Sequence, residues 1–341
     1  MGSGKQRATR LQDVADAAGV HVSTASRALS ERTAALVSHQ TLIRVHEAAD
    51  DLGYRMNGLA RALKTKRSHS IGMIIPDIRN PFFPPAVWGA EGVLGRQGFS
   101  LLLSSSDNDP GKARRQVSAM LEGRVDGLLL AMTRRDDVLV DELRAGEVPV
   151  VLMNRTVDRG GVSAVVPDDN NGTLLAVEHL YGLGHRRMGF VGGPLFTSNG
   201  ERRRASFEQT VARLGLPDRA IVEAAAFDIA AGARGAAELF DQHPATTAVV
   251  AGNDLIAIGV IEEAERRGRS CPADVSVVGF NDMLLADRLR PPLTTVRVLE
   301  DEVGARAAEL LLATVEDPGR HTETVLISGE LVVRGSTAAP G

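Results

Sequence analysis

The sequence has a single cysteine and lacks several common enzyme motifs and any long apolar run. Its one cysteine, Cys271, can form neither an internal disulfide nor a cysteine zinc cluster nor a redox pair. No GxSxG, HExxH, P-loop or GxGxxG motif occurs, and the eight histidines are scattered. No apolar run approaches the roughly 18 residues of a membrane helix, and the polar N-terminus has no apolar core of a secretory signal. We therefore expect a cytoplasmic protein without catalysis, metal or cofactor.

What is present begins with two short helical patterns joined by a glycine. Apolar residues at helical spacing predict a first helix that ends at Gly19, because glycine adopts the left-handed conformation of a tight turn without steric cost. Thr9 and Gln12 have the capping-box spacing that predicts the start of this helix. The two helical stripes are Leu11, Val14, Ala15 and Ala18, followed by Val22, Ala25, Ser26 and Leu29.

The second helix turns a different face outward, and this face carries short hydrogen-bonding side chains and one guanidinium: His21, Ser23, Thr24 and Arg27. Arginine can donate two hydrogen bonds to a guanine edge, and serine and threonine donate or accept, so this face suits a DNA major groove. A third stripe between Ser38 and Gly53 would complete a three-helix core. The alternative is a helical hairpin that only packs and contacts no DNA.

Charge is distributed unevenly along the chain. Residues 1–67 hold 11 Lys and Arg against 6 Asp and Glu, whereas the whole chain has a net charge of −4, so the remainder carries −9. A basic head on an acidic body favours contact with phosphate at one end only. The segment NGLARALK then places Leu59, Ala60 and Leu63 beside cations, which suits insertion of an apolar wedge into a minor groove. The alternative for this segment is a plain flexible linker.

From residue 71 onward, short apolar runs alternate with helical patterns. Continuous apolar strands between helices predict parallel sheets covered on both faces, and about 270 residues favour two doubly wound α/β subdomains over one. The predicted strands have the sequences IGMIIP, FSLLLSSS, VDGLLLAM, PVVLM, MGFVGG, TAVVAGND and VSVVGFND. We expect a head at 1–56, a hinge at 57–69 and a body at 70–341, with an N-lobe at about 70–168 and 299–325 and a C-lobe at about 169–298 and 326–337.

Polar and aromatic residues gather where these strands end, and in doubly wound folds ligands bind beyond the carboxyl ends of the strands. A sugar or similar polyol needs amide and guanidinium groups for its hydroxyls and flat apolar faces for its ring. The candidates for these two tasks are Asn154, Arg203, Asn253 and Asn281, and Phe82, Phe83, Phe196 and Phe227.

Several residues near these strand ends also have simpler structural interpretations. Asp254 suits the N-cap of the next helix as well as it suits a ligand, and Asp282 could only brace a turn. Phe82 or Phe83 could be ordinary core. His185 lies in a turn that enters a strand, so we expect it to make a structural hydrogen bond.

Taken together, the head, hinge and body resemble the LacI/GalR family of bacterial transcription repressors from about Leu11 to Thr337. The motifs that carry the resemblance are DVADAAGVHVSTASRAL in the head, NGLARALK in the hinge, and IGMIIPDIRNPFF, RVDGLLL, VEHLYGLGHRRMGFVGG, VVAGND, DVSVVGFND and PPLTTVRV in the body. The resemblance implies an all-α helix-turn-helix head on a two-lobed, periplasmic-binding-protein-like α/β body.

In the head and hinge, the resemblance places Val22, Ser23 and Arg27 on the recognition helix, facing the bases, and makes Leu63 the leucine that intercalates. One departure is His21, which stands where the family usually has serine. The full set of expected DNA contacts comprises His21, Val22, Ser23, Thr24, Arg27, Ser30, Ser38, Asn57, Ala60, Leu63 and Lys64.

In the body, the resemblance favours Arg203, Asn253 and Asn281 as effector contacts. Asn281 stands where many sugar-binding members have aspartate. Because an amide donates as well as accepts hydrogen bonds, the pattern of hydroxyls that it recognises should differ.

The expected function is that of a sequence-specific DNA-binding repressor, a homodimer whose affinity for a palindromic operator is controlled by a sugar or sugar derivative. We place the dimer contact on the body, and no heptad-patterned helix follows Thr337 to build a tetramer. The alternative is a periplasmic-type solute-binding protein, which shares the two-lobed body but needs export and no DNA-reading head. An enzyme on the same scaffold would need a convergent nucleophile, base or metal set, and the sequence offers none.

Overall fold

The computed structural model of the chain separates into two compact units, Met1–Ser68 and His69–Gly341. The residues that the structure describes are 9–29, 33–54, 67–216 and 220–341. Within those ranges, every helix is too short or too polar to cross a membrane.

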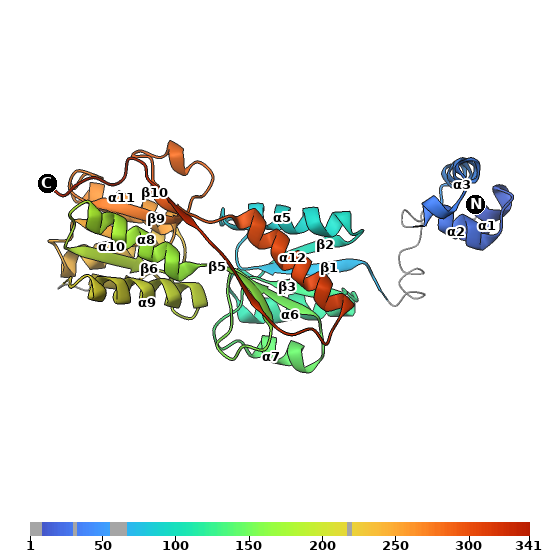
Figure 1. Ribbon diagram of the computed structural model, residues 1–341, viewed down its shortest axis with the longest axis horizontal. Helices are drawn as coiled ribbons and strands as arrows, with labels where there is room; N and C mark the ends of the chain where they lie inside the picture. Colours follow the sequence, from blue (N-terminus) through green and yellow to red (C-terminus); the bar gives the residue numbers. More distant parts are fainter. Residues whose placement is uncertain (1–8, 30–32, 55–66, 217–219) are drawn as a thin grey trace, which may run out of the picture. The chain divides into compact units, whose positions relative to one another are not determined.

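The first unit, the head, is a cluster of short helices (Figure 1). Its small aliphatic core includes Val14, Ala25 and Val45, one from each main helix. Gly19 has a φ of +62° and makes the turn between the first two helices, as its sequence position predicts. Ser38 caps the last helix, since its hydroxyl accepts from the N–H of Thr41. The helices are α1 (Leu11–Ala17), α2 (Val22–Ala28), η1 (Ala34–Leu36) and α3 (His39–Asp51).

Helix α1 does not begin with the capping box that Thr9 and Gln12 predict. Arg10 is the N-cap, and its N–H donates to the carboxylate of Asp13 at 2.7 Å. The Thr9 hydroxyl instead donates to the carbonyl of Leu52 at 3.0 Å, which ties the start of α1 to the end of α3. The prediction was wrong because the carboxylate of Asp13 is a stronger acceptor for a free helix N–H than the amide of Gln12.

The second unit, the body, has two lobes that each contain one six-stranded sheet. In the N-lobe the strand order is β11-β5-β4-β3-β1-β2, with all pairs parallel. Its strands are β1 (Ser70–Ile75), β2 (Ser100–Ser105), β3 (Gly127–Leu130), β4 (Val150–Met153), β5 (Ser163–Pro167) and β11 (Thr324–Ile327). Its helices are α5 (Phe83–Arg96), α6 (Pro110–Glu122), α7 (Val138–Ala145) and α12 (Glu300–Glu316).

The C-lobe repeats this arrangement with the order β12-β10-β9-β8-β6-β7, in which only the edge strand β12 runs antiparallel to its neighbour. Its strands are β6 (Met188–Gly192), β7 (Ala220–Glu223), β8 (Ala248–Ala251), β9 (Ser276–Asn281), β10 (Thr294–Arg297) and β12 (Glu330–Val332). Its helices are α8 (Asp169–Gly182), α9 (Ser198–Arg213), α10 (Ile229–Gln242), α11 (Asp254–Arg266) and the short η2 (Ala286–Arg288).

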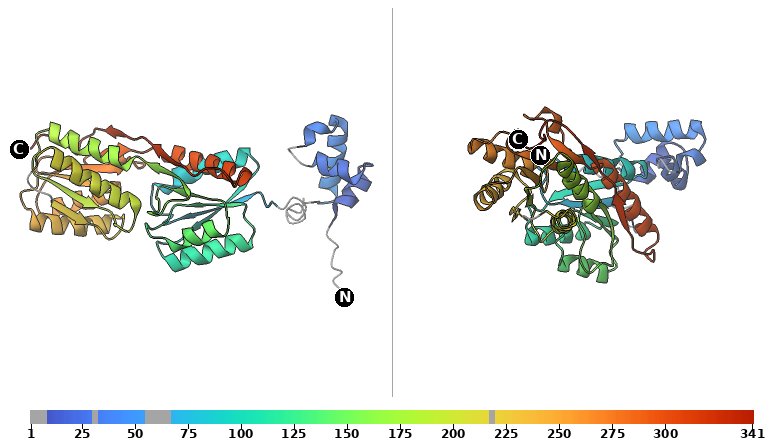
Figure 2. Two further views of the ribbon diagram at one scale, coloured as in Figure 1. Left: turned by 60° about the horizontal axis from the view of Figure 1, so that its bottom comes forward. Right: turned by 60° about the vertical axis from the view of Figure 1, so that its left-hand side comes forward.

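Both sheets are doubly wound, with helices on both faces of each sheet (Figure 2). The chain passes from one lobe to the other after β5, after β10 and after β11. Strand β11 carries the N-lobe to Ile327, slightly beyond the boundary near residue 325 that the sequence suggests. The predicted fold class, a helical head on two doubly wound α/β lobes, is confirmed.

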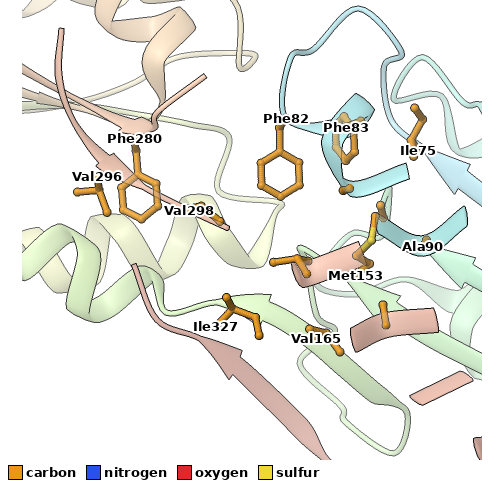
Figure 3. Close-up of a cluster of buried hydrophobic side chains, with 14 of the residues drawn as sticks. Ile75, Phe82, Phe83, Ala90, Met153, Val165, Phe280, Val296, Val298 and Ile327 are labelled. Atoms are coloured by element: carbon orange, nitrogen blue, oxygen red, sulfur yellow. The ribbon is translucent and has the colours of Figure 1, made fainter. Parts of the chain in front are cut away.

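Apolar side chains from the two lobes and from the crossing segments form a joint cluster (Figure 3). Phe82 and Met153 belong to the N-lobe, Phe280 to the C-lobe, and Val298 and Ile327 lie where the chain crosses. The cluster borders the carboxyl ends of the strands. It therefore packs beneath the polar side chains that follow these strands.

His185 has the structural role that its place in the sequence predicts. Its Nδ1 pairs with the hydroxyl of Thr247 at 2.9 Å, and its Nε2 lies 2.9 Å from the carbonyl oxygen of Ala338. Burial lowers the pKa of His185, which favours the neutral ring. The side chain therefore fastens the C-terminal segment to the C-lobe.

Candidate functional site

A pocket lies at the carboxyl ends of the strands, between the two lobes of the body. Both sheets have their topological switch point there, between β1 and β3 in one lobe and between β6 and β8 in the other. Loops after β1 and β4 contribute one wall, and segments after β6, β7, β8 and β9 contribute the other. The lining residues are Asn80, Phe82, Phe83, Asn154, Arg155, Asn199, Arg203, Phe227, Asn253 and Asn281.

Two asparagines face this pocket from strand ends with left-handed backbones. Asn154 follows β4 with a φ of +64°, and Asn281 ends β9 with a φ of +118°. Asparagine tolerates this region better than most residues, so the turn geometry accounts for part of their presence. Both side-chain Oδ1 atoms are buried and lack a hydrogen-bond partner in the described structure. A buried acceptor without a partner is costly, so these two oxygens are suited to bind donors of a ligand.

Two further asparagines are partly committed to the protein itself. Asn253 is the N-cap of α11, and its Oδ1 accepts from the N–H of Ile256 at 2.9 Å. The Oδ1 of Asn199 accepts from the N–H of Gly200 at 3.0 Å. Each therefore has its amide NH₂ to offer to a ligand, and each is fixed in orientation by its helix terminus.

Arg203 lines the pocket, but its guanidinium already has protein partners. Its Nε donates to Oδ1 of Asp169 at 2.7 Å and its Nη1 donates to the carbonyl of Gly252 at 2.6 Å. The same guanidinium lies 3.6 Å above the ring of Phe280. These bonds use two of the five guanidinium N–H groups and hold α8, α9 and the end of β8 together, so they fix the orientation of the side chain that the sequence predicts as an effector contact. Sequence reasoning missed this because Asp169 lies 34 residues away.

Arg155, the residue directly after Asn154, has no such partners. It is 4% exposed, and its Nε and Nη1 are buried without a hydrogen-bond acceptor in the described structure. Burial lowers the pKa of Arg155 to about 10, and repulsion from Arg203 and Arg134 acts in the same direction. The pocket therefore contains a cation whose charge the surrounding protein leaves uncompensated.

Three of the four predicted aromatic residues line the pocket. Phe82 and Phe83 are buried, and their rings pack edge to face with centroids 5.1 Å apart. Both residues belong to the core, and both also line the pocket. Phe227 approaches from the C-lobe. Phe196 does not line this pocket; it lies in an adjoining groove, where the guanidinium of Arg134 covers its ring at 4.1 Å. The prediction that Phe196 contacts the ligand directly therefore has less support than the other three.

The structure brings together most of the predicted set and adds Asn80, Arg155 and Asn199. Asn80 was missed because it reads as an ordinary turn residue, and its Oδ1 does accept from the N–H of Phe82 at 3.1 Å. Arg155 carried a signal, since it follows Asn154 at a predicted strand end. Asn199 lies in the strand-end segment Phe196 to Arg203, which the sequence singles out, but it was not chosen as a candidate contact.

Asp282 takes the structural role that the sequence left open, whereas Asp254 is not the N-cap of α11, which is Asn253, and instead binds residues from other segments. The carboxylate of Asp254 accepts from the Thr295 hydroxyl at 2.5 Å and from the N–H of Met283 at 2.7 Å. Burial raises the pKa of Asp254 to about 7. Asp282 forms ion pairs with Arg297 at 2.8 Å and Arg334 at 2.6 Å. Elsewhere in the described ranges, no three His, Cys, Asp or Glu side chains gather where a metal could bind.

In the head, α2 presents an exposed polar face. His21, Ser23 and Arg27 are exposed, whereas Val22 and Thr24 are half-buried. His21 is the N-cap of α2, and its Nδ1 lies 2.8 Å from the Ser23 hydroxyl, so part of its hydrogen-bonding capacity serves the helix. The expected DNA contacts Ser30, Asn57, Ala60, Leu63 and Lys64 lie outside the described residues.

Two family models match the chain. Residues 10–57 match the model described as "Bacterial regulatory proteins, lacI family", and residues 177–337 match the "Periplasmic binding protein-like domain". The first match covers the helices of the head, and the second begins within α8 and covers the rest of the C-lobe, the last two crossing segments, α12 and β11.

Curated relatives and solved structures match nearly the whole chain. The ribose operon repressor of Bacillus subtilis (strain 168) is 33% identical over 306 residues, which cover 90% of this chain and 91% of the relative. The lac repressor dimer bound to operator and the anti-inducer ONPF superposes with a TM-score of 0.85 at 25% identity, covering 98% and 100% of the two chains. The complex of the regulator CelR with cellobiose gives a TM-score of 0.74 at 27% identity, covering 96% and 99%.

Proposed function

The chain belongs to the LacI family of bacterial regulatory proteins, and from this we propose that it is a homodimeric repressor whose affinity for a palindromic operator changes when a sugar-like effector binds between the lobes. The family consists of DNA-binding transcriptional regulators and not of enzymes. One observation carries the proposal: the same chain combines a helix with an exposed polar face and a two-lobed body whose pocket holds unpaired polar atoms.

The head supports recognition of bases in a major groove. Arg27 is exposed in the last turn of α2, and Ser23 is exposed in its first turn. Arginine reads guanine by two parallel hydrogen bonds, and a short hydroxyl side chain can approach a base edge or a phosphate. Two heads related by a twofold axis would read two half-sites of a palindrome in bacterial cytoplasm, where operator DNA lies.

The pocket supports a polyol as effector. Unpaired amide oxygens of Asn154 and Asn281 can accept from hydroxyls, and the rings of Phe82 and Phe227 offer flat apolar surface. Two relatives point the same way in their names, one as a ribose operon repressor and one as a complex with cellobiose. We therefore place a sugar or sugar derivative in this pocket.

Hydrogen bonds join the two lobes of the body next to residues that line the pocket. The N–H of Arg135 donates to the carbonyl of Phe196 at 2.9 Å, and the N–H of Thr156 donates to the Ser198 hydroxyl at 2.8 Å. A ligand that prefers one arrangement of these loops would shift the lobes between two states. A differential affinity of about 1 to 3 kcal/mol would change operator affinity roughly 5- to 150-fold.

An apolar surface on the N-lobe supports dimerisation through the body. Strand β2 is the edge strand of its sheet, and its Leu102 and Leu103 are exposed. Beside it, Trp88 is 70% exposed on α5, and Ile78 is exposed in the loop after β1. Large apolar side chains gathered at a sheet edge favour contact with a partner surface. A second copy of this chain is the partner that we propose, and the lac repressor structure is itself a dimer.

The proposal is tested with the full-length protein in two steps. Selection from random duplex DNA should enrich a palindrome, and fluorescence anisotropy on that sequence, with a scrambled duplex as control, should show specific binding. Titration of a panel of sugars should then change the anisotropy in one direction or the other. Sugar binding by calorimetry without any enriched DNA sequence would instead support the solute-binding alternative.

A further inference from the structure

Arg155 is the one pocket-lining cation of the described structure that no protein group neutralises. Its neighbour Arg203 has an ion pair with Asp169, whereas the Nε and Nη1 of Arg155 have neither a carboxylate nor a carbonyl partner in the described structure. The guanidinium of Arg155 instead faces an aromatic ring, because it lies 5.9 Å from the ring centre of Phe227. A buried guanidinium without acceptors is rare because its desolvation is costly.

The charges around Arg155 increase this cost. Arg203 and Arg134 are the charged groups that act on it, and both are cations. Arg155 nevertheless remains protonated at neutral pH, because burial lowers its pKa only to about 10. The free protein therefore holds a positive charge at the wall of a pocket that is also lined by Asn154, whose Oδ1 is unpaired.

We propose that the effector is an anionic sugar derivative, a polyol that bears one carboxylate or phosphate group, and that Arg155 binds this group. The inference rests on the proposed function and narrows its effector class. A neutral sugar would cover Arg155 with hydroxyls and leave its charge uncompensated, whereas an anion restores the charge balance and accepts two parallel hydrogen bonds from a guanidinium. The Oδ1 atoms of Asn154 and Asn281 accept from the hydroxyls of the same molecule.

The first experiment uses inorganic phosphate, so that it does not depend on knowing the sugar. Thermal unfolding of the full-length chain is followed while phosphate replaces chloride at constant ionic strength. Phosphate should raise the melting temperature of the wild type and of Arg155→Lys, but not that of Arg155→Met. Arg204→Met is the matched control, because Arg204 pairs with Glu208 on the same helix as Arg203 without lining the pocket. Equal responses of wild type and Arg155→Met, or no response of the wild type, overturn the proposal.

The ligand-free protein provides a second readout that does not require binding. Arg155→Met keeps most of the side-chain volume and removes the unpaired charge, so the variant should be at least as stable as the wild type without phosphate. A marked loss of stability would mean that Arg155 has structural partners in solution, and the proposal would fall.

Calorimetry with matched sugars then distinguishes the two sources of the anion. For glucose and for ribose, the neutral sugar is compared with its aldonate and with its terminal phosphate. The aldonate or the sugar phosphate should bind at least about tenfold more tightly than the neutral sugar. Tighter binding of the aldonate identifies a carboxylate ligand, and tighter binding of the sugar phosphate identifies a phosphate ligand. A neutral parent that binds more tightly than both charged members contradicts the proposal.

The operator measurement separates this inference from the proposed function. If the wild type binds anions through Arg155 but no DNA sequence is enriched, the regulator proposal fails and the anion site stands. If an operator is found and only neutral sugars alter its occupancy, the regulator proposal stands and the anionic effector is wrong.

Discussion

The guanidinium of Arg203 and the carboxylate of Asp169 form a buried ion pair, with Nε donating to Oδ1 at 2.7 Å and side chains 3% and 1% exposed. The pair joins α9 to the start of α8, which is where the chain enters the C-lobe. An ion pair in this position fixes the pocket wall before any ligand binds. Because each charge compensates the other, the effects of replacing Arg203 and Asp169 on the free energy of unfolding should not be additive.

Arg203→Met should destabilise the body by about 3 to 5 kcal/mol, because Asp169 would remain buried without its counter-charge. Asp169→Asn alone should cost a similar amount, since it leaves the guanidinium uncompensated. The double variant should recover most of the loss, as both charges are then gone. Urea unfolding followed by circular dichroism measures all four proteins, and strictly additive losses would contradict the coupling.

Arg27→Ala should weaken binding to the cognate operator by about 1 to 3 kcal/mol and relax base choice at one position per half-site. The reason is the exposed position of Arg27 on α2, from which it can reach a base edge. Arg44→Ala, which removes an exposed arginine from α3, is the control and should leave base choice intact. Binding-site selection with each variant is the measurement. An unchanged preference in Arg27→Ala would show that Arg27 contacts only phosphate.

Leu63→Ala should reduce the bend of the operator and the specific affinity while leaving effector binding intact. The hypothesis comes from the sequence, since Leu63 lies outside the described residues, and an apolar side chain among cations suits insertion between base pairs. Leu59→Ala tests whether any apolar loss in this segment has the same effect. Gel mobility of circularly permuted operator fragments reports the bend, and equal angles for Leu63→Ala and the wild type would exclude the wedge.

Asp254 should make the stability of the body depend on pH. Its pKa is raised to about 7 in the folded state, against roughly 3.9 in an unfolded chain, so the folded state retains a proton that the unfolded state releases between these values. The stabilising contribution is thus fully present below about pH 4 and is lost as the pH rises toward 7. Asp282 and Glu300 repel the ionised form, and burial raises the pKa of Glu300 to about 8.

Asp254→Asn isolates this contribution, because the amide can donate to Thr295 while its oxygen accepts from the N–H of Met283, as the protonated acid does. The difference in unfolding free energy between the variant and the wild type should grow in favour of the variant from pH 4 to pH 7. A difference that is constant over this range would show that Asp254 is already ionised at pH 4.

The sequence predicted elements with continuous apolar runs and missed several whose runs are mixed. Strands β1, β4, β6, β8 and β9 carry continuous apolar residues and were predicted, whereas β7, β10 and β12 mix polar residues with apolar ones. Such edge or late strands are defined by their neighbours in the sheet, which a local pattern does not reveal.

The candidate site was predicted in its membership but not in its electrostatics. Strand ends and family motifs pointed to Asn154, Asn253 and Asn281, because a parallel sheet collects these positions at one edge. Arg203 is neutralised by Asp169, which is far from it in the sequence, whereas Arg155 has no such partner. A local pattern does not show this difference, so the sequence analysis chose Arg203 as a ligand donor and did not choose Arg155. The assignment of effector contacts stays a prediction until a bound ligand is measured.

Trp88→Glu should dissociate the proposed dimer and thereby weaken operator binding, since two linked heads bind a palindrome far more tightly than one. Trp88 is 70% exposed beside the edge strand β2, where burial against a second copy would remove a large apolar side chain from water. Val138→Glu is the control, because Val138 is 56% exposed at the start of α7 rather than beside β2. Sedimentation velocity should give a monomer for Trp88→Glu and a dimer for the control and the wild type. If Trp88→Glu remains a dimer with full operator affinity, the contact lies on another face of the body.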